Sequence, residues 1–222
     1  MSGELDEAGV LTAIAGVLDP ELDRSIVELG FVRRIRVAAG EVRVELRLPT
    51  YWCAPNFSWL MAEDVREALL ADPRVADVEV VLVDHHAAGE ISAGISSGRA
   101  FADVFGEAPD GQLVDLRDLF RRKALLARQE RALRPLGGDP SRLCIGDLPE
   151  TDEVRSYLEA REELGLDCSP QAPALTDAAG RPVRGARVDE HLRRARLMGV
   201  SIEGNAAFCR GLLATRYGET PE

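Results

Sequence analysis

Apolar and polar positions follow two different periods in the first third of the chain. Apolar residues spaced by three and four predict amphipathic helices over residues 7–18 and 57–71. Apolar residues at every second position predict strands over residues 31–37, 42–48 and 75–83. The order is helix, strand, strand, helix, strand, which predicts an α+β fold with a helix packed on one face of a small sheet.

Beyond this region, the apolar residues show only the spacing that is typical of helices. A weak helix is expected over residues 90–105, followed by a turn-rich break at 106–111 that contains Pro109. Residues 167–187 are rich in proline and glycine and are expected to form an irregular loop. Four further helices are expected, the last with Ser201 as its N-cap, over residues 113–136, 151–164, 188–198 and 203–217.

These patterns predict a division of the chain into three parts. Residues 1–88 form the α+β domain, residues 89–110 are a linker or helix, and residues 111–222 form a mainly helical domain. With 222 residues, the chain is long enough for one sizeable domain or two small ones.

Charge and hydropathy narrow the classes of partner. No apolar run is long enough to span a bilayer, and the first residues are acidic where a signal peptide would be basic, so we expect a cytoplasmic protein. The net charge of −11 lies mostly in the first half, which argues against nucleic acid or an anionic membrane as the main partner. Arginines along residues 113–136 could dock an acidic protein or nucleic acid, or they could form an ordinary solvated face.

The stretch 48–57 places Cys53 between the expected end of a strand and the expected start of a helix. A helix start offers unpaired N–H groups and the positive end of the macrodipole, which favour an anion such as a thiolate. The alternative is a buried cysteine that acts as a small apolar residue. The other cysteines form no C-x-x-C pair, so their spacing predicts neither a zinc knuckle nor a disulfide framework, and we expect a structural role for Cys144, Cys168 and Cys209.

A second candidate site follows the third expected strand, where Asp84 precedes His85 and His86. Adjacent imidazoles and a carboxylate suit Fe(II) or zinc. Neighbouring residues at the end of a strand point to opposite faces, however, which makes it awkward for both histidines to bind one ion. The alternative is an ordinary polar exit from the strand into a loop.

Four segments, in this order, carry a resemblance to a known family. They are Asp19-Pro20-Glu21, residues 25–32, Pro49-Thr50-Tyr51-Trp52-Cys53, and residues 63–69 together with 75–83. With these segments, residues 6–84 resemble the metal–sulfur cluster assembly family that includes the PaaD and SufT proteins. The resemblance implies the same helix, strand, strand, helix, strand fold and a role in assembling iron–sulfur clusters or transferring them onto target proteins.

The same resemblance implies which residues form the site. Cys53 would be the reactive cysteine, with Asp19 and Thr50 as further site residues, and Glu28 stands where an aspartate is usual. The chain departs from the family in having Trp52 where a glycine commonly precedes the cysteine. Since tryptophan would not replace a glycine at positive φ without strain, we expect a different backbone path for this loop.

The tail of the chain carries a separate resemblance. Residues 201–210 resemble the tail of cluster-assembly-like proteins associated with bacterial soluble di-iron monooxygenases. This implies a dedicated factor that helps one oxygenase system acquire its iron or its iron–sulfur centre. The alternative is a metal-free chaperone or scaffold that binds an oxygenase subunit.

The number of thiols limits how a cluster could be held. Iron–sulfur clusters are bound by thiolates, and one cysteine is too few for the usual four. A transient iron–sulfur cluster or iron would therefore be shared across a homodimer or with the protein that receives it. We expect an assembly factor and not an enzyme. A hydrolase in particular is not favoured, because the chain has no nucleophile elbow, phosphate loop or HExxH motif.

Overall fold

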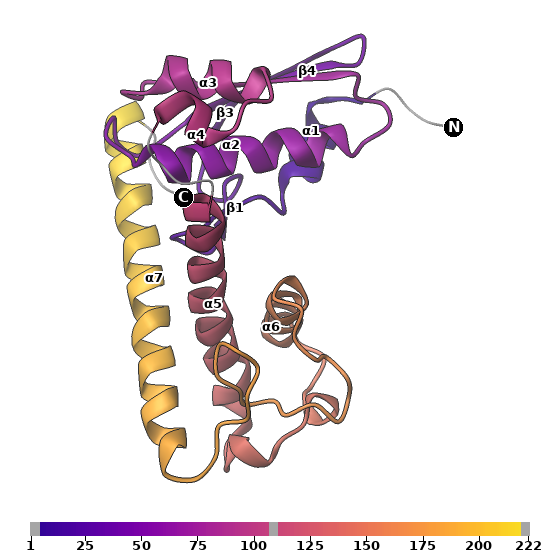
Figure 1. Cartoon of the computed structure of the whole chain (residues 1–222), viewed down its shortest axis with the longest axis vertical. Helices are drawn as coiled ribbons and strands as arrows, with labels where there is room; N and C mark the ends of the chain where they lie inside the picture. The colour runs from indigo at the N-terminus through magenta and orange to yellow at the C-terminus, as the bar shows by residue number, and fades with distance from the viewer. Residues whose placement is uncertain (1–4, 107–110, 219–222) are drawn as a thin grey trace. The chain divides into compact units, whose positions relative to one another are not determined.

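The computed structural model describes residues 5–106 and 111–218 and divides the chain into two compact units (Figure 1). The first unit comprises Met1–Val114 and Asn205–Glu222, and the second comprises Asp115–Gly204. The predicted domain ranges 1–88, 89–110 and 111–222 stay predictions. The compact unit that holds the sheet also includes the segment Asn205–Glu222. Residues 107–110, which belong to the expected break, lie outside the described residues.

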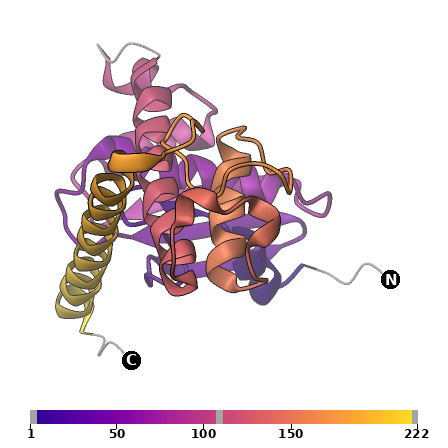
Figure 2. The same ribbon diagram turned by 90° about the horizontal axis from the view of Figure 1, so that it is seen from below.

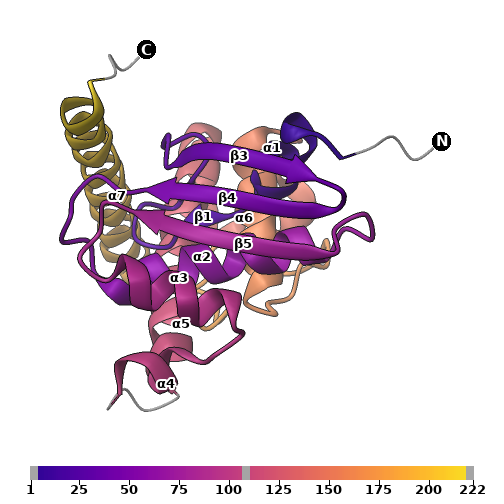
Figure 3. The same ribbon diagram turned by 90° about the horizontal axis from the view of Figure 1, so that it is seen from above.

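The first unit is built on a three-stranded sheet in the order β3-β4-β5 (Figure 3). Strand β3 (Val32–Ala38) pairs antiparallel with β4 (Glu41–Arg47), and β4 pairs parallel with β5 (Asp77–Val83). Val42, Val44 and Leu46 are buried and lie in register with Val78, Val80 and Leu82. The three strands predicted from alternation are confirmed, and the alternation sets which face of the sheet forms the core.

Helices cover the buried face of this sheet. Helix α1 is Glu7–Ile14, and α2 is Pro55–Leu70, the crossover that makes β4 and β5 parallel. The first predicted helix extended to residue 18, but α1 ends earlier because Leu18–Asp19 forms the short strand β1, paired with β2 (Arg24–Ser25). The α+β class and the predicted element order are confirmed.

The weak helix expected over residues 90–105 is two helices. Helix α3 (Ala88–Ser96) ends near Gly98, which has a positive φ of 64°, and α4 (Phe101–Phe105) begins after it. The ring of Trp59 on α2 is fully buried and lies edge-on to Phe101, with 5.5 Å between ring centroids. This aromatic contact fastens α4 to the core of the first unit.

The second unit contains α6 (Asp152–Glu163) and most of α5 (Gly111–Leu133), with an irregular loop after α6. In Figure 2, α6 and the loop that follows it (orange) lie beside α5 (red). Thr151 caps α6, accepting a hydrogen bond from the backbone N–H of Val154. The predicted long helix, the helix over residues 151–164 and the irregular loop are therefore confirmed.

The last part of the chain corrects the prediction of two helices over residues 188–198 and 203–217. Helix α7 runs without a break over Val188–Tyr217, so Ser201 lies inside it and is not an N-cap. Its buried positions Ala195, Ile202 and Ala206 continue at helical spacing through the expected gap. A glycine in a helix costs only about 1 kcal/mol relative to alanine, so Gly199 and Gly204 do not end a helix that this stripe stabilises.

Candidate functional site

Cys53 lies in the loop that joins β4 to α2, directly before the N-cap residue Ala54. The loop enters the helix through Pro55, which occupies the first helical turn, where a missing N–H costs nothing. The side chain of Cys53 is partly buried, and its Sγ lies 3.4 Å from Oγ1 of Thr50. The structure thus brings together two of the residues predicted from the sequence, and the hydroxyl of Thr50 can donate a hydrogen bond to a thiolate at Cys53.

The imidazole of His85 is hydrogen-bonded to the backbone of this loop. Its Nδ1 accepts a hydrogen bond from the N–H of Ala87 at 3.1 Å, so the proton sits on Nε2, which donates to the carbonyl oxygen of Cys53 at 2.7 Å. The side chain is buried, and burial lowers the pKa of His85. Because backbone groups occupy both ring nitrogens, the geometry gives His85 a positioning role and leaves no lone pair for a metal ion.

His86 belongs to an exposed aromatic stack beside Cys53. Its ring stacks on Trp52 with 5.3 Å between ring centroids. The backbone N–H of His86 donates a hydrogen bond to the carbonyl of Tyr51. The indole of Trp52 is 75% exposed and the phenol of Tyr51 is also exposed. Trp52 is not among the described residues with positive φ, so the loop accommodates tryptophan in the usual place of glycine without left-handed backbone.

Asp19 is buried at the end of β1 and shapes the turn that follows. Its Oδ1 accepts hydrogen bonds from the backbone N–H groups of Glu21 at 2.9 Å and Leu22 at 3.0 Å. Burial raises the pKa of Asp19 to about 6, although these two hydrogen bonds oppose the shift. Glu28 is exposed on the turn between β2 and β3, and among the described residues it makes no hydrogen bond or ion pair with the Cys53 loop.

Cys209 packs against the same hydrophobic core as Cys53, although the sequence suggested only a structural role for it. Its thiol is partly buried, and burial raises the pKa of Cys209 to about 11, with further contributions from the negative charges of Asp19, Cys53 and Glu21. A cysteine on the apolar stripe of a helix looks like core in the sequence, so no local signal pointed to its position. Only the packing of the last part of α7 within the first unit reveals it.

In residues 5–106 and 111–218, no three side chains of the His, Cys, Asp or Glu type lie so that they could hold a metal ion by themselves. Within the same ranges, no helix combines the length and the apolar character needed to cross a membrane.

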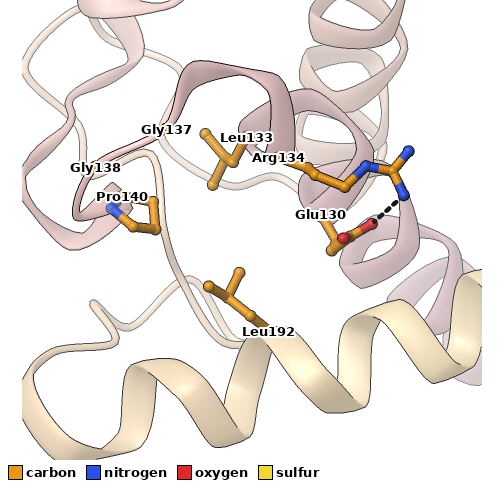
Figure 4. Close-up of a pocket in the computed structure, with 7 residues that line it drawn as sticks. All are labelled: Glu130, Leu133, Arg134, Gly137, Gly138, Pro140 and Leu192. Atoms are coloured by element: carbon orange, nitrogen blue, oxygen red, sulfur yellow. Dashed lines mark ion pairs between the residues drawn. The ribbon is translucent and has the colours of Figure 1, made fainter.

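A cavity of about 210 Å³ occurs in the second unit (Figure 4). Its walls include Leu133, Pro140 and Leu192, with an ion pair at one side between Glu130 and Arg134, whose charged atoms are 3.8 Å apart. The cavity is smaller than the roughly 300–1,000 Å³ of typical ligand pockets, and it contains none of the predicted site residues.

The arginines of α5 are largely occupied by other groups of the second unit. Arg128 is buried and donates to the carbonyl of Ser156, and Arg122 pairs with Asp118 and also donates to the carbonyl of Ala178. Arg131 lies 3.8 Å from a carboxylate oxygen of Glu203. Through these contacts, the arginines of α5 contribute to packing within the second unit.

Comparison with known proteins places the Cys53 loop inside a recognised segment. Residues 7–81 match the model of a family described as iron–sulfur cluster assembly protein. This segment is similar to that family. The resemblance predicted from the four sequence segments is confirmed. The family segment contains Asp19, Glu28, Thr50 and Cys53, whereas His85, His86 and Cys209 lie outside it.

Two curated relatives match about a third of the chain. The iron–sulfur cluster carrier protein of Synechocystis sp. is 39% identical over 71 residues, and that of Deinococcus radiodurans is 37% identical over 71 residues. Each match covers 32% of this chain and 20% of the relative. The chain thus spans about a fifth of the length of the curated relatives that it matches.

Proposed function

We propose that this protein carries an iron–sulfur cluster or iron transiently at Cys53 and delivers it to a recipient protein. The observation that carries the proposal is the family match, which spans the loop in which the thiol of Cys53 meets the hydroxyl of Thr50. The two relatives named as iron–sulfur cluster carriers support the same role. We further propose that the protein acts stoichiometrically, without catalytic turnover.

The geometry of the loop suits a cargo that must be released. A cluster requires about four thiolate ligands, so a site that supplies fewer needs ligands from a recipient or from a second copy of the chain. Incomplete ligation favours exchange because an incoming thiolate meets an open position on the iron. The hydrogen bond from His85 fixes the carbonyl of Cys53, which keeps the loop in place while the ligands change.

The exposed stack of Tyr51, Trp52 and His86 offers a contact for the recipient beside the thiol. Aromatic side chains are enriched at protein interfaces because they bury much area at low entropic cost. We propose a component of a bacterial di-iron monooxygenase as the recipient, on the resemblance of residues 201–210. We place the activity in the cytoplasm, where thiols stay reduced, since all four cysteines are free.

Anaerobic reconstitution with iron and sulfide tests the proposal. The wild type should develop labile visible absorption from thiolate-to-iron charge transfer, and Cys53→Ser should lose it. Cys144→Ser, which changes a partly buried cysteine of the second unit, should keep it. Equal, negligible iron in the wild type and in Cys53→Ser would refute the carrier and favour the metal-free scaffold that binds an oxygenase subunit.

A further inference from the structure

The sheet of the first unit has a charged face opposite its apolar one. Along β4, Glu45 alternates with the buried Val44 and Leu46, so its side chain lies on the face away from the core. Arg43 and Arg47 share this outer face, because each lies two positions from Glu45 in the strand. Figure 3 looks onto the outer face, and α2 lies behind the strands.

The edge strand β3 adds arginines to the outer face. Arg34 lies opposite Glu45, and Arg36 lies opposite Arg43, in the antiparallel register of β3 and β4. Residues that are directly opposite each other lie on the same face of a sheet, and both arginine side chains of β3 are exposed. Residues 1–105 contain nine arginines and no lysine, and five of the nine lie in β3 and β4. The positive charges of the acidic half of the chain are therefore gathered on this sheet.

Two of these five arginines are paired with carboxylates of the same sheet. Arg43 forms an ion pair with Glu79, its neighbour in the parallel register of β4 and β5. Arg33 lies 3.7 Å from a carboxylate oxygen of Glu45. These two glutamates are thereby used within the sheet.

Arg34 and Arg36 are different. Among the described residues, neither side chain takes part in a hydrogen bond or an ion pair. Arg36 instead lies directly opposite Arg43, and like charges in such a cross-strand pair are destabilising. Glu79 lies on the far side of Arg43, so it offsets the charge of Arg43 and not that of Arg36. Anionic groups placed over β3 would gain from two positive charges that nothing in the sheet neutralises.

We propose that the outer face of β3 and β4 docks an extended acidic segment of a partner protein, whose carboxylates pair with Arg34 and Arg36. A guanidinium can bind a carboxylate through two parallel hydrogen bonds. In an extended segment, side chains at every second position are about 7 Å apart, which is also the spacing of Arg34 and Arg36 along β3. This docking does not depend on the cargo at Cys53.

The composition of the outer face favours a protein over a nucleic acid. The three strands span only about 10 Å, since neighbouring strands lie about 4.8 Å apart. No residue of the described strands β3, β4 and β5 is aromatic, so the strands offer no ring on which a base could stack. Four carboxylates share the face and would repel a continuous phosphate backbone: Glu41, Glu45, Asp77 and Glu79. Separate carboxylates of a protein segment can avoid them and still reach β3.

Fluorescence anisotropy of a labelled oligo-glutamate peptide, titrated with the reduced full chain at low ionic strength, tests the surface. The wild type should bind the peptide, and Arg34→Gln/Arg36→Gln should lose about tenfold in affinity. Arg184→Gln/Arg196→Gln is the matched control, because it removes the same charge from exposed positions of the second unit, and it should bind as the wild type does. Equal losses in the two double variants, or no binding by the wild type, would overturn the docking surface. The arginines would then only protect an edge strand from aggregation.

Chemical protection provides a test that does not depend on the folding of a variant. Phenylglyoxal modifies accessible arginines, and the bound peptide should slow the modification of Arg34 and Arg36 in the wild type but not that of Arg184, as mapped by mass spectrometry. Unchanged modification of the two β3 arginines would contradict the proposal. Tighter binding of an oligothymidylate of equal charge, lost in Arg34→Gln/Arg36→Gln, would replace the protein partner with a nucleic acid.

Discussion

Both units bury polar side chains, but they use them differently. In the first unit, the buried side chains of Asp19 and His85 hydrogen-bond to backbone groups of the β1 turn and of the Cys53 loop. In the second unit, the buried side chains of Gln129, Tyr157 and Arg161 hydrogen-bond to one another. The first arrangement positions a loop whose thiol and aromatic rings remain accessible, whereas the second fixes the packing of helices.

The network of the second unit centres on the hydroxyl of Tyr157. This hydroxyl donates to the carbonyl of Ala174 at 2.9 Å and accepts from Gln129 at 2.9 Å and from Arg161 at 2.8 Å. One donor and two acceptor positions are thereby all used. His191 lies 3.0 Å from the amide oxygen of Gln129, which extends the network to α7. A fully satisfied network of this kind specifies one packing of the core.

The largest expected effect is therefore on stability, from removing Arg161. The Arg161→Met substitution leaves the carbonyls of Asp167 and Pro173 and one acceptor position of Tyr157 without their charged donor. Hydrogen bonds to charged groups contribute about 1.5–3 kcal/mol each, and we expect a loss of about 4 kcal/mol in the free energy of unfolding. Urea denaturation measures the loss, and hydrogen exchange localises it to the second unit.

Arg155, on the same helix, provides the matched control. It is exposed and forms a surface ion pair with Asp152, so Arg155→Met should change stability by less than about 0.5 kcal/mol. The visible absorption after reconstitution with iron and sulfide should be unchanged in both variants. Equal losses in the two variants would show that the buried network has no special role.

The next effect is a pH dependence that originates in the first unit. Burial raises the pKa of Asp19 from 3.8 to about 6, so its contribution to stability is fully present below pH 3.8 and is lost as the pH rises through 6. Between pH 4.5 and 8 we expect a loss of about 2 kcal/mol from this group. Asp19→Asn can keep both backbone hydrogen bonds, and urea unfolding across this range should show that the variant lacks the loss. Parallel profiles for wild type and variant would contradict the assignment.

Removal of His85 should have a somewhat smaller effect with the opposite dependence on pH. Burial lowers the pKa of His85, so its contribution is present at neutral pH and is lost as the pH falls below the unfolded value of 6.5. His85→Ala leaves the carbonyl of Cys53 unpaired, which should cost about 1–2 kcal/mol at pH 7.5. The freed loop should also let iodoacetamide modify Cys53 faster.

His86→Ala is the control for His85→Ala. The ring of His86 is exposed and makes stacking contacts with His85 and Trp52, so its loss should cost less than about 0.5 kcal/mol. A larger loss in His86→Ala than in His85→Ala would mean that the outer ring, and not the buried one, holds the loop.

The sequence predicted the first unit well where periodicity carries the information. The strict alternation of residues 42–48 set the buried face of β4, and Cys53 was placed correctly between a strand and a helix. The role of His85 was not predictable, because the carbonyl to which its ring donates belongs to Cys53, which is distant in sequence. The two adjacent histidines look equivalent in the sequence, yet burial separates them into a positioning residue and an exposed one.

Long-range packing accounts for the other differences. Ser201 resembles an N-cap locally, but the apolar stripe of α7 continues past it, and tertiary packing outweighs the local preference. The position of Cys209 depends on how α7 docks, which no local pattern encodes. The network of Gln129, Tyr157 and Arg161 joins helices and loops whose relative register is set only by folding.

The smallest expected effect on stability comes from removing the exposed Trp52 of the site. The buried Trp59 provides the comparison. Trp59 is fully buried beneath Phe101 and Phe105, so Trp59→Ala should cost about 4 kcal/mol. Trp52 is 75% exposed, so Trp52→Ala should change stability by less than about 0.5 kcal/mol and remove the solvent-exposed, red-shifted part of the fluorescence. Because the indole contacts the rings of Tyr51 and His86, the iron bound on reconstitution should be unchanged, while transfer of a reconstituted cluster to an apo-acceptor should slow. A Trp52→Ala protein that transfers at the wild-type rate would show that the aromatic stack does not contact the acceptor.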